Sequence, residues 1–162
     1  MTPALASACA MAIEQFRFTE MQVQQSSPFP CDNNTISVAF KTNVPVYKSC
    51  HPKLTLSGFA GGVVWPPAGN MALNDVGGSG SVGSSIGFGE TGEWGGPSAG
   101  VLKMLDLFTN FEADTFYRIS FVVTNPRSSQ SAQSISYNFA MTSSGSPDLD
   151  SMNVGPILLI AG

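Results

Sequence analysis

The sequence carries little charge, and this scarcity excludes several classes of function. Charged side chains make up 11% of the 162 residues, under half of the roughly 25% usual in soluble domains. Only seven residues are Lys or Arg and the net charge is −4, so no basic patch can neutralise a phosphate backbone and nucleic-acid binding is not expected. No apolar run approaches the ~20 residues of a membrane-spanning helix, so no membrane span is expected.

Groups that catalyse reactions or bind metals are also scarce. The only histidine, His51, lies between Cys50 and Pro52, and no Gly-x-Ser-x-Gly elbow accompanies it. The cysteines lack a zinc-binding spacing, and the segment containing Asp148 and Asp150 lacks the glycine and glutamate of an EF-hand loop. We therefore expect no catalytic residue, no cofactor and no metal, and the chain is not predicted to be an enzyme.

The cysteines and one sequon are the candidate modification sites. Three cysteines, Cys9, Cys31 and Cys50, leave at least one outside any pair formed within the chain. Cys31 and Cys50 flank an expected strand and are the candidates for a disulfide closing a loop of about 20 residues; the alternative is buried free thiols. Asn33 begins the sequon Asn33-Asn34-Thr35 at an expected turn. With the neutral polar composition, these features favour a secreted or cell-surface location.

What is abundant is alternation of apolar and polar residues with period two. It runs through residues 36–41, 53–57, 117–124 and 134–141, and it predicts half-buried antiparallel strands. Less regular strands are expected at 101–108 and 154–161, and short ones around residues 63–65 and 83–88. Near the start, Phe16 and Phe18 share one parity while Met21 and Val23 share the other, which indicates either a β-bulge between the two pairs or a strand that passes from one sheet to the other.

About seven short strands with almost no helical periodicity predict two packed antiparallel sheets, in an immunoglobulin-like β-sandwich. Residues 61–100 are rich in Gly and Ser and are expected to form long loops carrying Trp65 and Trp94. Tyr117, just after an expected corner, resembles a tyrosine corner. Residues 1–24 are predicted to be an N-terminal segment or linker strand, and residues 25–162 the sandwich module.

Several short motifs follow one another in a fixed order. They read QSSPFP at residues 25–30, NTISV at 34–38, NVPV at 43–46, KLTLSGF at 53–59 and VTNP at 123–126. Together they resemble a repeat of very large secreted proteins of unicellular algae, and the match covers residues 16–161. The resemblance implies an extracellular, immunoglobulin-like repeat module with a structural role and little chemistry. Cys50-His51-Pro52 departs from the pattern.

Two functions are consistent with this composition. The first is a non-enzymatic structural module of a cell surface or filament, in which apolar edge or terminal strands pair with copies of the chain or with similar neighbouring modules. The candidate residues for such assembly are Phe16, Phe18, Ile157, Leu158, Leu159 and Ile160. The alternative is an adhesive module that binds glycans through the loops of Trp65 or Trp94, with Glu90 and Glu93 close to Trp94 in sequence.

Overall fold

The structure is a computed structural model that describes residues 16–75, 91–105, 110–129, 131, 133–141 and, for the course of the backbone alone, 149–158. The strands are β1 (Phe18–Gln25), β2 (Asn33–Thr42), β3 (Lys53–Ser57), β4 (Gly69–Ala72), β5 (Asn74–Asp75), β6 (Thr91–Trp94), β7 (Val101–Leu105), β8 (Tyr117–Thr124), β9 (Ser134–Met141) and β10 (Leu149–Leu158). A 3₁₀-helix (Lys48–Cys50) and α1 (Gly96–Ala99) are the helical elements of the described residues.

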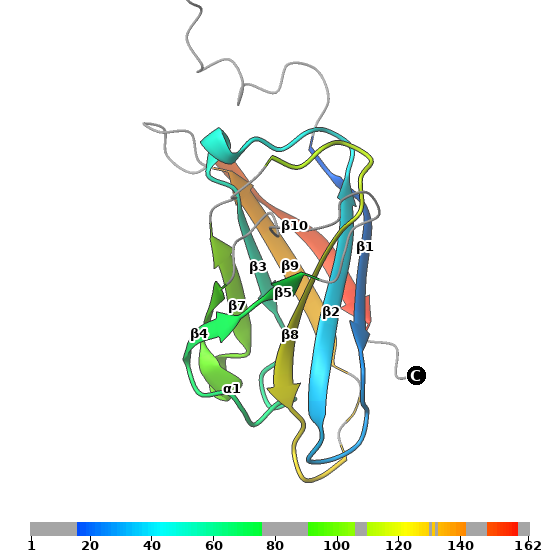
Figure 1. The fold of residues 1–162 in the computed structure, drawn as a ribbon, viewed down its shortest axis with the longest axis vertical. Helices are drawn as coiled ribbons and strands as arrows, with labels where there is room; N and C mark the ends of the chain where they lie inside the picture. Colours follow the sequence, from blue (N-terminus) through cyan, green and yellow to red (C-terminus); the bar gives the residue numbers. More distant parts are fainter. Residues whose placement is uncertain are drawn as a thin grey trace, which may run out of the picture.

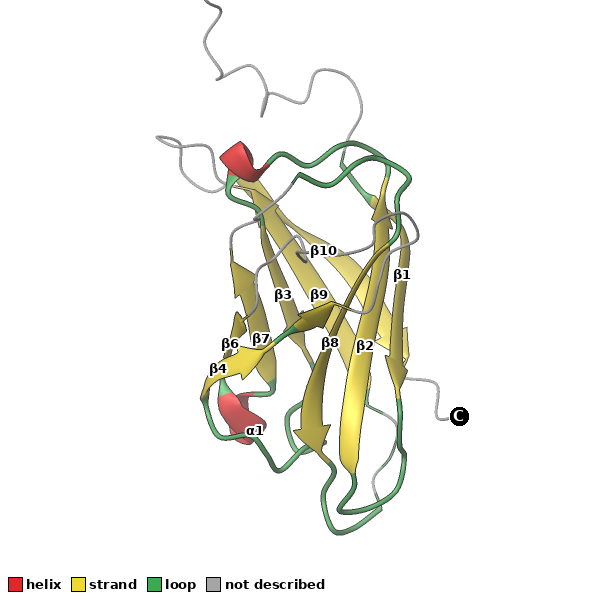
Figure 2. Ribbon diagram, in the orientation of Figure 1, coloured by secondary structure: helices red, strands yellow, loops and turns green. Residues whose placement is uncertain are grey.

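Two antiparallel sheets face each other across one core (Figure 1). The strand order is β1-β2-β8-β5 in the first sheet and β10-β9-β3-β7-β6-β4 in the second. Both sheets consist of strands, and helix among the described residues is confined to two single turns near opposite ends (Figure 2). The predicted all-β antiparallel sandwich is confirmed. There are more strands than the seven expected, because the Gly-rich region contributes β4, β5 and β6. The short strand expected around residues 83–88 lies outside the described residues. No helix among the described residues is long and apolar enough to cross a membrane.

The core confirms the period-two alternation. In β3, Leu54 and Leu56 are fully buried while Thr55 between them is not, and β9 alternates in the same way. Each such side chain contributes roughly 1.5–3 kcal/mol by leaving water. The largest fully buried side chains come from both sheets: Trp94, Phe40, Phe111, Phe121, Leu54, Leu56, Leu102, Met104, Ile119, Ile135 and Val38.

The first described residues belong to the sandwich and do not form a linker. Phe16 stacks on Phe139 with ring centroids 4.5 Å apart, and Phe18 meets Phe40 and Phe139 edge-on. β1 pairs with β2 along its whole length, with a register shift between Phe18 and Glu20. Of the two alternatives for the parity change, the bulge is thus the one observed, and the boundary expected after residue 24 falls inside a strand.

The expected Cys31–Cys50 disulfide is wrong. The Cys31 thiol is free and exposed, whereas Cys50 is disulfide-bonded. Cys31 lies in the turn before β2 and Cys50 in the 3₁₀-helix beyond its other end, so the ten residues of β2 separate them (Figure 1). An extended strand of that length spans roughly 30 Å, far beyond the ~7 Å between Cα atoms that a disulfide permits. The remaining cysteine, Cys9, lies outside the described residues.

Tyr117 makes the hydrogen bond expected of a tyrosine corner. The backbone N–H of Glu112 donates to the Tyr117 hydroxyl at 2.7 Å, five residues upstream of the tyrosine. The Tyr117 ring packs against Phe111 with centroids 4.3 Å apart. This hydrogen bond and this ring contact fix the chain as it enters β8, an inner strand of the first sheet.

Gly100 is a position where only glycine fits. It has φ 59 after α1, and a Cβ there would overlap the backbone of Phe59 and Ala60. Gly61 has a similar φ of 73, but a Cβ there would meet nothing within 4 Å.

This pair provides a matched test of the close approach. We expect Gly61→Ala to lower the free energy of unfolding by about 1 kcal/mol, from left-handed backbone strain alone, and Gly100→Ala by more than about 3 kcal/mol because backbone must move. Urea denaturation followed by tryptophan fluorescence measures both. Equal effects of the two substitutions would contradict the close packing of α1 on the loop after β3.

Candidate functional site

Three connections meet at the end of the sandwich where β2 begins and β8 ends. They are the β1–β2 turn, the loop after β3 and the β8–β9 connection, seen at the lower end in Figure 1. The QSSPFP motif forms the first and the NP of VTNP opens the third. Motifs about 100 residues apart in sequence are thereby brought together.

The side chain of Asn34 holds two of these connections to each other. Its Oδ1 accepts hydrogen bonds from the backbone N–H groups of Ser26 and Ser27, at 3.1 and 3.2 Å. Its Nδ2 donates to Gln25 Oε1 at 3.0 Å and to Asn125 Oδ1 at 2.9 Å. Asn34 is 2% exposed, so all four hydrogen bonds that an amide side chain can make are formed out of contact with water.

Asn125 continues the network into the turn. Its Nδ2 donates to the carbonyl oxygens of Ser27 and Phe29, both at 2.9 Å. No buried side-chain nitrogen or oxygen of the described residues lacks a partner. A buried amide network that is fully satisfied fixes one geometry, because any shift leaves costly unpaired groups.

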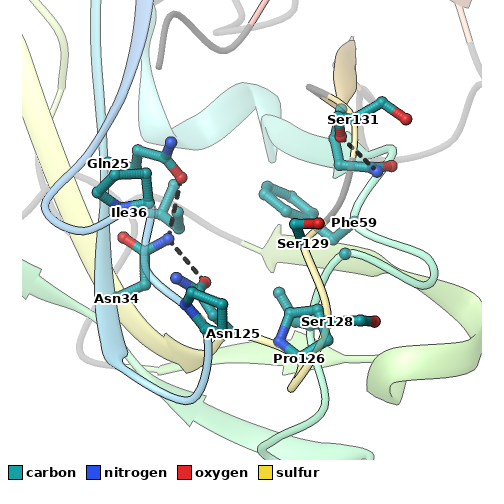
Figure 3. A pocket seen from close by; sticks show the side chains of 14 residues that line it. Gln25, Asn34, Ile36, Phe59, Asn125, Pro126, Ser128, Ser129 and Ser131 are labelled. Atoms are coloured by element: carbon teal, nitrogen blue, oxygen red, sulfur yellow. Dashed lines mark hydrogen bonds between the residues drawn. The ribbon is translucent and has the colours of Figure 1, made fainter. Parts of the chain in front are cut away.

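A pocket of about 150 Å³ opens beside this network (Figure 3). Phe59, Pro126 and Ser129 lie on one side of it, and Gln25 and Asn34 lie on the other. Its 14 lining residues also include Pro28, Pro30, Ile36, Gly62, Val63, Asn125, Ser128, Ser131 and Gln133. The volume is about half the lower limit usual for drug-sized ligands, so the pocket suits a single small group such as a sugar ring or one side chain.

The pocket is electrically neutral. No Asp, Glu, Lys, Arg or His is among its lining residues. Within the described part of the chain, Gln25 Nε2 and the hydroxyls of Ser128 and Ser129 form no hydrogen bond with the protein, and all three residues line the pocket. Neutral donors and acceptors beside an aromatic ring suit an uncharged polar ligand; they provide neither a nucleophile beside a base nor a metal-ligand set.

The two tryptophans differ in accessibility. Trp94 is 1% exposed, and its indole N–H donates to the carbonyl oxygen of Pro66 at 2.9 Å. Trp94 is therefore a core residue, and the expectation that its loop presents it to glycans is wrong. Trp65 is 54% exposed and forms a bridge to Thr124 at the end of β8, close in sequence to the pocket residues Val63 and Asn125.

The other residues singled out from the sequence are not brought together. Glu93 forms an ion pair with Lys103 at 3.3 Å on the surface, and His51 caps the 3₁₀-helix in a left-handed conformation with φ 44. Glu90 and Asp148 lie outside the described residues, and only the backbone of Asp150 is described. The described residues contain no group of three or more potential metal ligands.

The residues predicted to take part in assembly are described to different extents. Phe16 and Phe18 pack in the core of their own chain, so their side chains are not free for a neighbouring copy. Ile157 and Leu158 lie in β10, where only the backbone is described, and Leu159 and Ile160 lie outside the described residues. Asn33 is exposed, and its Oδ1 accepts from the hydroxyl of Thr124 at 3.3 Å.

The comparisons with known proteins leave the fold and this end of the sandwich as the basis for a function. No protein-family model matches the sequence, and neither does any curated protein.

The role of Asn34 was missed from the sequence, although a signal was present. Asn34 shares its parity with Ile36, Val38 and Phe40, so the alternation places it on the buried face. A polar residue at such a position needs internal hydrogen-bond partners. Its partners lie on the preceding turn and about 90 residues away, and spacing alone cannot identify them.

The neighbouring asparagines allow a direct test of the network. We expect Asn34→Ala to lower the free energy of unfolding by about 2–4 kcal/mol, because it leaves the Ser27 amide and the Asn125 side-chain oxygen without their partner. The Ser26 amide loses one of two acceptors, since it also donates to the Thr35 carbonyl at 3.0 Å. Asn33→Ala removes one long surface hydrogen bond and is expected to change it by less than about 0.5 kcal/mol. Urea titration of unglycosylated protein measures both. An Asn34 variant as stable as the Asn33 variant would show that the network does not hold this end together.

Proposed function

We propose that the chain is a non-enzymatic structural module of an extracellular or cell-surface assembly, and that copies of it join through the edge of β1. The observation that carries the proposal is the contrast between β1 and the other edge strands. Sheet edges attract further strands unless they are short, bulged or interrupted by charge or proline.

Three of the four edge strands are protected in these ways. β5 has two residues and β4 has four. β10 has two register shifts along its pairing with β9 and contains Pro156. Each of these edges offers too short or too irregular a row of backbone groups for another strand to pair with.

β1 lacks this protection in its second half. From Glu20 to Gln25 it pairs with β2 in unbroken register, and after Glu20 this stretch contains no charged residue and no proline. After Glu20, the outward-facing residues are Gln22 and Gln24, which are neutral and exposed. Among the described residues nothing pairs with the outer edge of β1, so this is where a second copy can extend the sheet.

A symmetric antiparallel pairing of two β1 strands is chemically compatible. If it is centred on Gln22, Glu20 faces Gln24 of the second copy and Met21 faces its Val23. Residues on the same face of the sheet then oppose each other and no like charges meet. The interface is the same patch on both copies, as in most homodimers.

The module class is supported by the connectivity. The orders β1-β2-β8-β5 and β10-β9-β3 correspond to the A-B-E-D and G-F-C sheets of immunoglobulin-type sandwiches. The resemblance to algal extracellular repeats supports the same class, and two of its motifs form the end held by Asn34.

A second candidate is recognition of neutral glycans at the pocket end. The neutral lining and the 54% exposure of Trp65 favour it. A protein that stays monomeric at all concentrations but binds uncharged saccharides, with binding lost in Trp65→Ala, would replace the assembly proposal with this one.

The assembly proposal is tested by a charge placed on the inner face of β1. Met21 is partly buried against the core, so a lysine there can reach water at an open edge but is enclosed when a second strand pairs. We expect Met21→Lys to weaken self-association at least tenfold in sedimentation velocity.

The matched control is Gln24→Lys, which adds the same charge on the outer face, opposite Glu20 of the second copy. We expect it to retain association. Far-ultraviolet circular dichroism checks that both variants fold. A wild-type protein that is monomeric at high concentration, or equal weakening by both lysines, would contradict pairing through β1.

A further inference from the structure

An exposed apolar surface lies on the outer face of the first sheet, at its pocket end. Val64 and Trp65 are each 54% exposed, and Val122 is 37% exposed. The N–H of Val64 donates to the Thr124 carbonyl at 2.9 Å, and the Thr124 N–H donates to the Trp65 carbonyl at 3.0 Å. Two consecutive residues therefore oppose one, as in a β-bulge, which accounts for two large neighbouring side chains both facing water.

The register places the sequon directly across from this surface. Asn33 of β2 pairs with Thr124 of β8, and Thr124 bridges to Trp65 on its other side. Asn33, Thr124 and Trp65 thus form one row across three chain segments. Adjacent strands are about 4.8 Å apart, so Asn33 and Trp65 are roughly 10 Å apart between their backbones, a gap that one sugar residue on Asn33 can bridge.

The Asn33 amide is free at the atom that glycosylation modifies. It is exposed, and its Oδ1 is held by the Thr124 hydroxyl at 3.3 Å. In the described part of the chain no hydrogen bond involves its Nδ2. By contrast, both Nδ2 hydrogens of Asn34 are used in the buried network.

We propose that Asn33 carries an N-linked glycan whose first N-acetylglucosamine packs on the Trp65 ring and covers the Val64–Val122 surface. This rests on the proposed extracellular location, because the modification occurs along the secretory route. Asn33 Nδ2 forms a bond to C1 of the sugar and loses one proton. The bond from C1 to the pyrophosphate of a polyprenyl-linked oligosaccharide breaks, and the polyprenyl pyrophosphate leaves. Oδ1 is unchanged, so the contact with Thr124 that orients the amide persists.

Packing of the sugar on Trp65 follows from the chemistry of the two partners. A pyranose has one face of C–H groups, and the indole of Trp65 is a large flat apolar ring. The rest of the chain leaves this ring about half exposed. Neighbouring apolar side chains that share one exposed surface are a common feature of interaction sites. The tether on Asn33 gives this one a high local concentration of its partner.

The test uses full-length protein secreted from a eukaryotic host. Intact mass and peptide mapping establish whether Asn33 is occupied. Iodide quenching then reports the accessibility of Trp65, because Trp94 is buried and contributes little. We expect the quenching constant of the glycosylated protein to be at least twofold lower than that of Asn33→Gln or Thr35→Ala. Protection is expected to survive an endoglycosidase that leaves a single N-acetylglucosamine.

Controls separate this inference from the assembly proposal. Thr35→Ser keeps the sequon and is expected to behave as the wild type, while glycoforms of Trp65→Phe are expected to quench alike. An unoccupied Asn33 in secreted protein, or equal quenching with and without the sugar, would overturn the inference. Self-association through β1 is measured on bacterially produced protein without glycan, so each idea can fail without the other.

Discussion

The hydrogen bonds of the Asn34 side-chain amide join the β1–β2 turn to the end of β8. These two segments are about 90 residues apart in sequence and adjacent at the pocket end. One oxygen receives two backbone N–H groups of the β1–β2 turn, and one nitrogen reaches Gln25 and Asn125. The amide is buried, so each of these bonds forms in a medium where an unpaired group is expensive. The turn, the entry to β2 and the exit from β8 are consequently fixed relative to one another.

The functional proposals depend on this constraint. The pocket beside Asn34 keeps its shape because two of its walls are held by the same side chain (Figure 3). Asn33 lies one residue earlier, so the register that buries Asn34 necessarily turns Asn33 outward toward Thr124 and Trp65. The hydrogen bonds to Ser26 and Ser27 also anchor the residues immediately after β1, whose regular second half is the edge proposed for assembly.

The sequence predicts the sandwich well because alternation is a local signal. β2, β3, β8 and β9 lie where the period-two runs placed them, and the parity change after Phe18 correctly marks the bulge in β1.

Predictions that depended on distance in space were less successful. Cys31 and Cys50 flank the same strand, but that strand holds them at opposite ends. Trp94 lies in a Gly-rich region that suggested an exposed loop, yet the β6–β7 pairing carries it into the core. Phe16 was placed with the terminal segment because its partner Phe139 is more than 120 residues away.

The most direct measurement of the central claim is amide hydrogen exchange, resolved by residue with nuclear magnetic resonance. If Asn34 Oδ1 holds the turn, the amide of Ser27 exchanges as slowly as those of paired strand residues such as Val38, although Ser27 lies outside every strand. Exchange of Ser27 as fast as that of Ser128 in the exposed β8–β9 connection would contradict the claim that this buried amide organises the end of the sandwich.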